Sequence, residues 1–394
     1  MKSMRIIVCF ILLLNLIPTS VLAQEPDVAA TAAILMDAKT GRVLWEKNAD
    51  TPLAMASTTK IMTSILALES GKLDETVTVS KAAAAAPRMK MYLTTGEKIR
   101  LGDLLLALML ESSNDAAVAI AEHIAGSVPD FCAMMTQKAK DVGAKNTVFE
   151  TPNGLDGETH HSTAYDLAMI TRYALDVPGF IELINTHHAT FSSDTKTYNK
   201  TNKNRLLHEF DGANGVKTGF TNKAGHCFVG AAKRGDMQLI SVVLASGWGD
   251  KGRAQKWIDT KEVLNYGFDN FAYETIIEDN TQAGVISLTR SRTTELSYIY
   301  TADLTIALNT EEKSQIEVKV NVPPSIQAPI FEGDILGQAE IYLNGQLYAS
   351  IDLAATDNAL RHDFKTSLEK VLNQWLSQVL DEEIELILPE LPMA

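Results

Sequence analysis

Residues 52–62 read PLAMASTTKIM, which places Ser57 three positions before Lys60 and directly ahead of an apolar run. Positions i and i+3 lie on one face of a helix, so this hydroxyl and this amine can meet there. A serine at this place can also serve only as a helix cap. The spacing does not decide between a nucleophile and a cap, because the chain repeats it as Ser193/Lys196 and Ser367/Lys370.

The surroundings of the three pairs separate them. Ser57 precedes a helix expected from the apolar stripe in 61–68, where unpaired backbone N–H groups and the positive end of the helix dipole lie. A lysine in a dry pocket has a lowered pKa, and its neutral amine can accept the serine proton. By contrast, Ser193 lies in a polar stretch and Ser367 on a terminal helix. We therefore expect Ser57 to be the nucleophile and Lys60 its base.

A second motif is Ser112-Ser113-Asn114, the one Ser-x-Asn of the chain, between the apolar runs LLLALML and AAVAIAEHIAG. A loop between two helices can present a hydroxyl and an amide to a site. Serine and asparagine are also favoured helix caps, and taken alone the motif fits a cap better. The sequence leaves both interpretations open.

A third motif, Lys-Thr-Gly, occurs twice. Lys39-Thr40-Gly41 falls in a turn between two expected strands, where these residue types are ordinary and solvated. Lys217-Thr218-Gly219 lies on an expected strand in NGVKTGFTNKAGHCFVG. There Lys217 and Thr218 can face a cleft, while Gly219 lets another backbone approach closely.

Taken in chain order, Ser57-x-x-Lys60, Ser112-x-Asn114 and Lys217-Thr218-Gly219 are the motif set of penicillin-binding proteins and serine β-lactamases. With NTVFETPNGLDGETHHSTAYDLA and AAILMDAKTGRVLWEKNAD, the chain resembles the serine-type D-alanyl-D-alanine carboxypeptidases, which are low-molecular-weight penicillin-binding proteins. The resemblance implies an α+β fold. A β-lactamase/transpeptidase-like domain, with an antiparallel sheet flanked by helices, is followed by a small all-β domain and a C-terminal amphipathic helix.

The resemblance also implies a reaction. Ser57 would attack the carbonyl between two D-alanines of a peptidoglycan stem peptide, expel the last one and leave an acyl-enzyme that water hydrolyses. Lys60 would take the serine proton, and Asn114 would hold the substrate amide and orient Lys60. Ser112 would relay a proton to the departing amine. β-Lactam antibiotics would act as inhibitors by acylating the same serine.

The terminal carboxylate of such a substrate would meet Lys217 and Thr218, because a cation and a hydroxyl suit an anion. The oxyanion would lie between the backbone N–H groups of Ser57 and Phe220. Arg253 in DKGRAQ is a further candidate for the carboxylate; the alternative is a solvated arginine at a helix start.

Two alternatives remain at this point. A serine β-lactamase uses the same motifs with an added carboxylate for deacylation, for which Glu158 in GLDGETHH is the candidate, although a loop acid is usually solvated. A non-catalytic envelope protein that binds the cell wall through its β domain is the other.

The first 23 residues carry basic Lys2 and Arg5, an apolar stretch over 6–17 and a small Ala23. This pattern predicts a secretory signal peptide, because the apolar run is shorter than the ~20 residues that a membrane span needs. Removing two cations takes the formal net charge from -14 to -14 - 2 = -16. So acidic a chain is not expected to bind nucleic acid. With the resemblance, we expect an exported protein of the cell envelope or periplasmic space.

Cysteine and histidine patterns exclude other classes of site. Cys132 and Cys227 are the two cysteines left after cleavage, and they can pair or stay as buried thiols, which we favour. His160/His161 and His187/His188 lack the i, i+4 spacing of two ligands on one helix face. Neither a metal nor another cofactor is expected.

Composition changes along the chain predict four segments. A signal peptide at 1–23 is followed by a catalytic domain at 24–273, which mixes strands at its ends with helices over much of 58–186. Short alternating strands such as IEVKVNV and AEIYLNGQLYASIDL predict a β-rich domain at 274–360.

The fourth segment, 361–394, is an expected amphipathic helix with an acidic tail. Apolar residues recur at helical spacing over 363–380, including Trp375. Such a helix can lie on a membrane surface, as related carboxypeptidases use it on the outer face of the cytoplasmic membrane. The acidic residues that follow it, Asp381 to Glu390, suit anionic lipid poorly. Packing against the β domain is the equal alternative.

Overall fold

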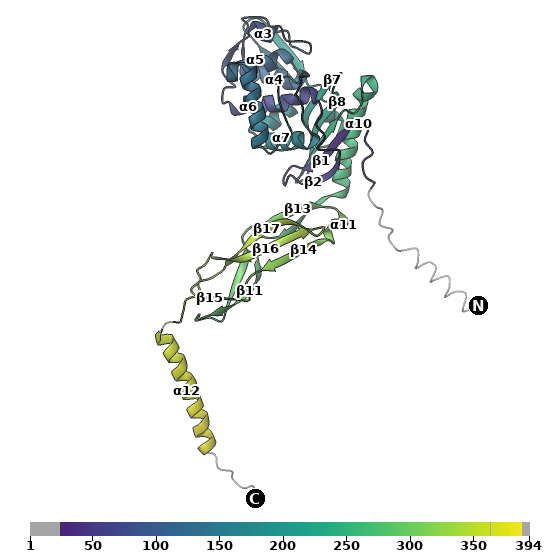
Figure 1. The fold of residues 1–394 in the computed structure, drawn as a ribbon. Coiled ribbons are helices and arrows are strands. Elements are labelled where there is room, and N and C mark those ends of the chain that lie inside the picture. The colour runs from purple at the N-terminus through teal and green to yellow at the C-terminus, as the bar shows by residue number, and fades with distance from the viewer. Residues whose placement is uncertain (1–23, 363, 388–394) are drawn as a thin grey trace, which may run out of the picture. The chain divides into compact units, whose positions relative to one another are not determined.

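The chain divides into two compact units, with the boundary between Phe271 and Ala272. The computed structural model describes residues 24–362 and 364–387, and within the last helix it leaves out the side chains of 366, 370 and 378–387 (Figure 1). The predicted signal peptide at 1–23 lies outside the described residues.

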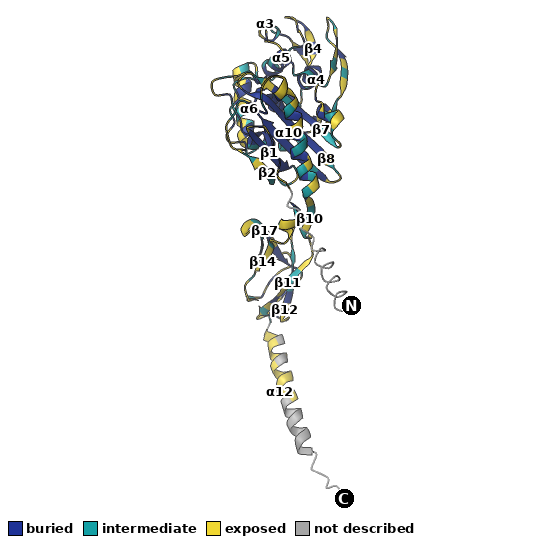
Figure 2. Ribbon diagram, turned by 90° about the vertical axis from the view of Figure 1, so that its right-hand side faces the viewer, coloured by how far each residue is buried: buried dark blue, intermediate teal, exposed yellow. Residues whose placement is uncertain are grey.

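The first unit is built on an antiparallel five-stranded sheet. In spatial order its strands are β2 (Val43–Lys47), β1 (Ala32–Asp37), β9 (Met237–Leu244), β8 (Gly225–Arg234) and β7 (Ala213–Thr221). Strand β1 consists entirely of buried residues, as expected for a strand covered on both faces. The long helix α10 (Gly249–Asn270) packs against β8 and β9. Most residues of these two strands are buried, and Figure 2 shows β8 in dark blue. The predicted antiparallel sheet flanked by helices is confirmed.

The chain between β2 and β7 forms a helical layer. It contains the 3₁₀ helix η2 (Ala56–Thr59) and the helices α2 (Lys60–Glu69), α3 (Lys81–Ala84), α4 (Leu101–Glu111), α5 (Asn114–Ala125), α6 (Val128–Asp141), α7 (Ala164–Asp176), α8 (Phe180–Asn185) and α9 (Leu206–Glu209). Two antiparallel strand pairs interrupt it: β3 (Thr76–Thr78) with β4 (Lys98–Arg100), and the hairpin of β5 (His188–Ser192) with β6 (Thr197–Thr201).

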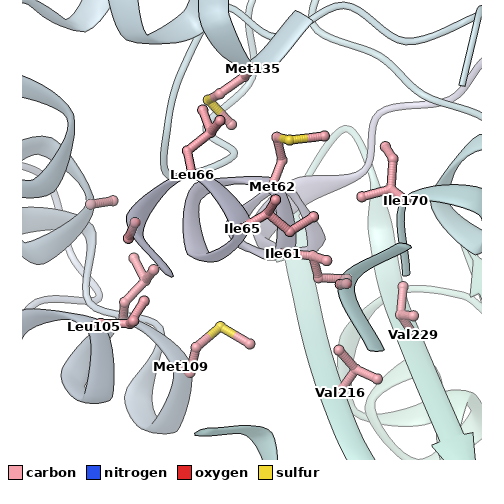
Figure 3. Packing of buried hydrophobic residues seen from close by; sticks show 14 of the residues in the cluster. Ile61, Met62, Ile65, Leu66, Leu105, Met109, Met135, Ile170, Val216 and Val229 are labelled. Carbon is pink, nitrogen blue, oxygen red and sulfur yellow. The ribbon is translucent and has the colours of Figure 1, made fainter. Parts of the chain in front are cut away.

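Helix α2 runs through the middle of this layer. Every residue from Lys60 to Ala67 is buried, so the helix has no solvent-facing side over its first two turns. Figure 3 shows Ile61 and Ile65 surrounded by side chains from α4, α7, β7 and β8. This packing fixes the start of α2 against the edge strand β7.

The second unit is the small all-β domain that the sequence predicts. Its larger sheet has the order β14 (Ile316–Asn321), β16 (Ile335–Leu343), β17 (Gln346–Ala355), β12 (Glu295–Tyr300), β11 (Gln282–Thr289), β15 (Ser325–Gln327). Strands β10 (Ala272–Ile277) and β13 (Leu304–Leu308) form a separate pair, and α11 (Thr310–Lys313) is a single turn. Buried residues such as Leu336, Ala339 and Leu353 form a core cluster of this domain.

The last helix, α12, spans Phe364–Ile387. Its apolar side chains are exposed over the described part, with Phe364 at 84% and Trp375 at 60%. Across the part of the chain that the structure describes, no helix combines the length and the apolar character needed to cross a membrane.

Candidate active site

Ser57 lies in η2, the short helix that leads into α2. Ala56 before it has a φ of 49°, in the left-handed region that side-chain-bearing residues rarely adopt. Strained backbone of this kind persists where the surrounding structure over-determines it, and here Met55, Ala56 and Thr58 are all fully buried. The Ser57 hydroxyl oxygen lies 3.3 Å from the carbonyl oxygen of Asn153.

The amine of Lys60 meets three oxygens. Its Nζ lies 2.8 Å from Ser57 Oγ, 2.9 Å from Asn114 Oδ1 and 2.5 Å from the Asn153 carbonyl oxygen. The residue is fully buried. Burial, with the neighbouring Lys217 cation as the next cause, holds the pKa of Lys60 well below its usual value, and Asp115 opposes the shift.

Backbone groups fix the Asn114 amide in one orientation. Its Nδ2 donates to the Arg88 carbonyl at 2.7 Å, so Oδ1 is the atom that faces Lys60. The carboxylate of the next residue, Asp115, accepts from the N–H groups of Met91 and Leu93 at 3.0 and 3.1 Å. The start of α5 is therefore fastened to the segment 88–93.

The serines of the Ser-x-Asn motif occupy helix-cap positions without capping through their side chains. Ser113 is the N-cap residue of α5, but its side chain makes no capping hydrogen bond. Ser112 ends α4 with a φ of 65°, and its buried hydroxyl has no hydrogen-bond partner among the residues that the structure describes. A buried hydroxyl without a partner is uncommon, and it leaves Ser112 Oγ available to a bound molecule.

Lys217 extends from β7 and is 3% exposed. Burial, followed by the nearby cations Lys256 and Lys203, lowers the pKa of Lys217 to about 7. A pocket joins this strand to the Ser-x-Asn loop. It is lined by Met89, Met109, Leu110, Glu111, Ser112, Asn202, Lys203, Asn204, Val216, Lys217 and Thr218.

Strand β7 runs directly beside the nucleophile. A Cβ atom at Gly219 would lie 3.0 Å from both the Met55 carbonyl oxygen and the Ser57 backbone nitrogen. Only glycine allows this approach without displacement. The next residue, Phe220, is 44% exposed and stacks on His226 with 4.3 Å between ring centroids.

Comparisons with known proteins agree with this geometry. Residues 19–247 match the family model of the S11 peptidases, described as D-alanyl-D-alanine carboxypeptidase, and residues 271–359 match that of the penicillin-binding protein 5 C-terminal domain. The chain belongs to the D-alanyl-D-alanine carboxypeptidase family. It is 31% identical to DacF of Bacillus subtilis (strain 168) over 91% of this chain and 92% of that protein.

Other relatives give the same picture. The carboxypeptidase DacC of Escherichia coli (strain K12) is 32% identical over 86% of this chain and 88% of its own. The crystal structure of penicillin-binding protein 5 from Haemophilus influenzae matches with a TM-score of 0.72 and 29% identity, covering 86% of this chain and 99% of that one. The family resemblance expected from the sequence is confirmed.

Within this family member, the repeated motifs fall into different environments. The Lys196 amine donates to the Tyr92 carbonyl at 2.6 Å and lies 3.5 Å from the Glu97 carboxylate, while the Ser193 hydroxyl oxygen accepts from the Lys196 backbone N–H at 3.2 Å. Lys39 lies in the turn between β1 and β2. Ser367 is exposed on α12, and the side chain of Lys370 lies outside the described residues.

Arg253 lies near the start of α10, where its side chain is 72% exposed and 3.6 Å from Asp250. Lys203, by contrast, lines the pocket that contains Ser112 and Lys217. Nothing in the sequence singles out Lys203, because a lysine in a polar stretch is usually solvated. Both cations remain candidates for the substrate carboxylate.

Sequence reasoning also missed Asn153 and His160. Asn153 acts through its main-chain carbonyl, for which no residue type is diagnostic. The following Gly154 has a φ of +82° and packs against the Ala56 carbonyl. The Asn-Gly dipeptide was the available signal, because it marks a tight turn.

The two cysteines are free and buried, as favoured from the sequence. Cys227 faces the Lys-Thr-Gly strand as the register partner of Gly219 on β8. Burial raises the pKa of its thiol to about 11. The thiol is therefore protonated at neutral pH and a poor nucleophile.

Proposed function

We propose that this chain is a serine-type D-Ala-D-Ala carboxypeptidase that removes the terminal D-alanine from peptidoglycan pentapeptide stems through an acyl-enzyme on Ser57. Penicillin would acylate the same hydroxyl. The observation that carries the proposal is the fully buried Lys60 amine 2.8 Å from Ser57 Oγ.

The bonds around Lys60 support its role as general base. A neutral amine has two N–H bonds, which can be donated to Asn114 Oδ1 and to the Asn153 carbonyl. Its lone pair is then directed to the Ser57 hydroxyl, which donates its proton as Oγ attacks the substrate carbonyl. The lowered pKa of Lys60 keeps this neutral form populated.

Charge develops on the substrate oxygen during the attack. The backbone N–H groups of Ser57 and Phe220 would donate to it, a role supported by the close approach of β7 to Ser57. When the peptide C–N bond breaks, Ser112 would pass a proton to the departing D-alanine amine. Water, deprotonated by Lys60, would then hydrolyse the ester and regenerate Ser57.

The terminal carboxylate needs a cationic site on the leaving side. Lys217 and Thr218 would supply a cation and a hydroxyl, and Lys203 lies in the same pocket. We assign Lys203 ahead of Arg253, because Arg253 is largely exposed and already beside Asp250. Replacing Lys203 by alanine should raise KM for the peptide more than the matched Arg253→Ala change does. The opposite order would restore Arg253 as the carboxylate ligand.

A β-lactamase would need a carboxylate that activates the deacylating water. Glu158 is exposed, which argues against that role for it. We therefore expect a stoichiometric burst of penicillin acylation followed by slow release. Rapid steady-state turnover of penicillin would instead favour the β-lactamase.

For localisation we propose export to the cell envelope, in keeping with the cell-wall peptides it would trim. Contact of residues 363–380 with the membrane surface is supported by the exposed apolar side chains of α12. Deleting residues 362–394 should then release the protein from the membrane fraction. Retention in that fraction would refute the contact.

One experiment tests the reaction and its class. A synthetic pentapeptide ending in D-Ala-D-Ala should release D-alanine with the purified chain and not with Ser57→Ala. Mass spectrometry after penicillin treatment should find one adduct, on the peptide that contains residues 57–60. An unmodified protein that still binds cell wall would favour the non-catalytic alternative.

A further inference from the structure

The segment 149–160 lies against the start of α2 at several points. The carbonyl oxygen of Asn153 contacts Lys60, and the neighbouring carbonyl of Pro152 accepts from Thr63 Oγ1 at 2.6 Å. Gly154 packs on the Ala56 carbonyl. This segment therefore supplies one wall of the Ser57–Lys60 site through main-chain atoms alone.

His160 ends the segment, and both of its ring nitrogens are bonded. Its Nδ1 accepts from the backbone N–H of Glu150 at 3.0 Å, and its Nε2 lies 2.9 Å from Thr59 Oγ1. A nitrogen that accepts from an N–H carries no proton, so Nε2 carries the proton and donates to Thr59. The ring is 2% exposed, and Phe149 covers it edge-on at 6.0 Å.

These two bonds do different things. The bond to Glu150 closes residues 150–160 into a loop, since it joins the first residue to the last. The bond to Thr59 fastens that loop to the residue directly before Lys60. The Asn153 carbonyl lies on the part of the loop held between them.

We infer that His160 is a positioning residue for the Ser57–Lys60 pair: as the neutral Nε2–H tautomer it fastens the 150–160 loop to Thr59 and so holds the Asn153 carbonyl against the lysine amine. The inference rests on the proposed acyl transfer at Ser57. It adds that the exclusion of water from Lys60 and the orientation of its amine depend on the His160 side chain, which touches neither the substrate nor the nucleophile.

Loosening the loop has a definite consequence for Lys60. Burial is the main cause of its lowered pKa, so water entering beside Asn153 raises that pKa toward the usual value. More of the lysine is then protonated at a given pH. The acid side of the acylation rate profile moves to higher pH, while Lys217 and Asp115, the charges that face Lys60, stay unchanged.

The imidazole has charged neighbours of both signs. Glu150 and Asp156 favour its protonation, whereas His161 and Lys223 oppose it. Burial outweighs these charges, lowers the pKa of His160 to about 4 and keeps the ring neutral over the working pH range.

The test compares His160→Ala, Thr59→Val and the control His161→Gln. His161 is the adjacent histidine, and its Nδ1 lies 2.6 Å from the carbonyl oxygen of the nearby Thr159. Acylation by fluorescent penicillin, followed across pH, should be ~10–10²-fold slower in the first two variants with the acid limb at higher pH, and unchanged in the control. His160→Gln, whose amide can donate to Thr59, should recover most of the rate.

A purely structural role predicts something else. Such a role would lower the fraction of folded enzyme but leave the acid side of its acylation rate profile at the same pH. If the acid side does not move in either His160→Ala or Thr59→Val, the inference is refuted. The double variant should be no slower than His160→Ala, because the bond that Thr59→Val removes is already lost in His160→Ala.

Hydrogen exchange provides a readout independent of the reaction. Backbone amides of 150–157 should exchange faster in both variants than in the wild type and the control. Unchanged exchange refutes the loop attachment whether or not the protein is acylated. Absence of acylation in the wild type refutes only the proposed function.

Discussion

Gly154 offers a sharp test of the site geometry. A Cβ atom at this position would lie 1.9 Å from the Ala56 carbonyl oxygen and 2.9 Å from the Ser57 nitrogen. Ordinary contact begins near 3.4 Å, so Gly154→Ala must separate the loop from η2 by 3.4 - 1.9 = 1.5 Å. Whichever side yields, the Asn153 carbonyl and the Ser57–Lys60 pair lose their present spacing.

The expected loss follows from that displacement. A misplacement of about 1 Å can cost ~10²-fold in rate, so acylation of Gly154→Ala should fall by about that factor or more. Its φ of +82° adds about 1–2 kcal/mol of backbone strain to the free energy of folding.

Gly126 is the matched control. It has the same φ of +82°, and no atom of the described residues lies within 4 Å of where its Cβ would stand, its own chain neighbours and helix backbone aside. Gly126→Ala therefore carries the strain without the clash. It should lose a similar 1–2 kcal/mol of stability and acylate at the wild-type rate.

The assay is the second-order rate of acylation by fluorescent penicillin, at a temperature where circular dichroism shows both variants folded. Equal rates for the two alanine variants, or a wild-type rate for Gly154→Ala, would refute the reasoning. Either result would mean that the contact between the loop and η2 does not set the position of the nucleophile.

Three further predictions follow from the buried groups. Lys60→Ala should acylate ~10²–10⁴-fold more slowly, whereas Lys39→Ala and Lys196→Ala should label normally with fluorescent penicillin. Burial lowers the pKa of His160 from 6.5 to about 4, so the stability that the neutral ring contributes is complete above pH 6.5 and is lost as the pH falls through about 4. Urea titrations should show that the free energy of unfolding falls over this range by an amount approaching about 3 kcal/mol. This loss should be absent in His160→Gln. Cys227, whose thiol has a pKa of about 11, should resist iodoacetamide in the native protein and react once the protein is unfolded in urea.

The sequence predicts the architecture well where the signal is periodic. Strands β1 and β2 around the Lys39–Gly41 turn, the β8–β9 hairpin and the helix before Ser112 follow from apolar spacing and turn residues. The sequence predicts the last helix of the first unit over 254–266, whereas the observed helix α10 is longer, beginning at Gly249 and ending at Asn270. Residues without strong apolar periodicity can still extend a helix once it packs on a sheet.

Of the site, only the side chains that belong to the motifs could be predicted from the sequence. Ser57, Lys60 and Asn114 follow from motifs, and the structure places their functional atoms within hydrogen-bond distance. The contributions of Asn153 and His160 could not be predicted from spacing, since they depend on a main-chain carbonyl and on a loop that folds back over nearly 100 residues of sequence.

The physical difference between Ser57/Lys60 and Ser193/Lys196 is the surroundings of the amine. Lys196 is partly exposed, and its amine lies 3.5 Å from the Glu97 carboxylate. Lys60 has no exposed surface, carbonyl oxygens as neighbours and the second cation Lys217 nearby, all in a site where a positive charge is poorly solvated. The identical spacing therefore places one amine in a buried site and the other at the surface. The residues that exclude water from Lys60, which the motif does not contain, are what would let Ser-x-x-Lys act as the catalytic pair that we propose.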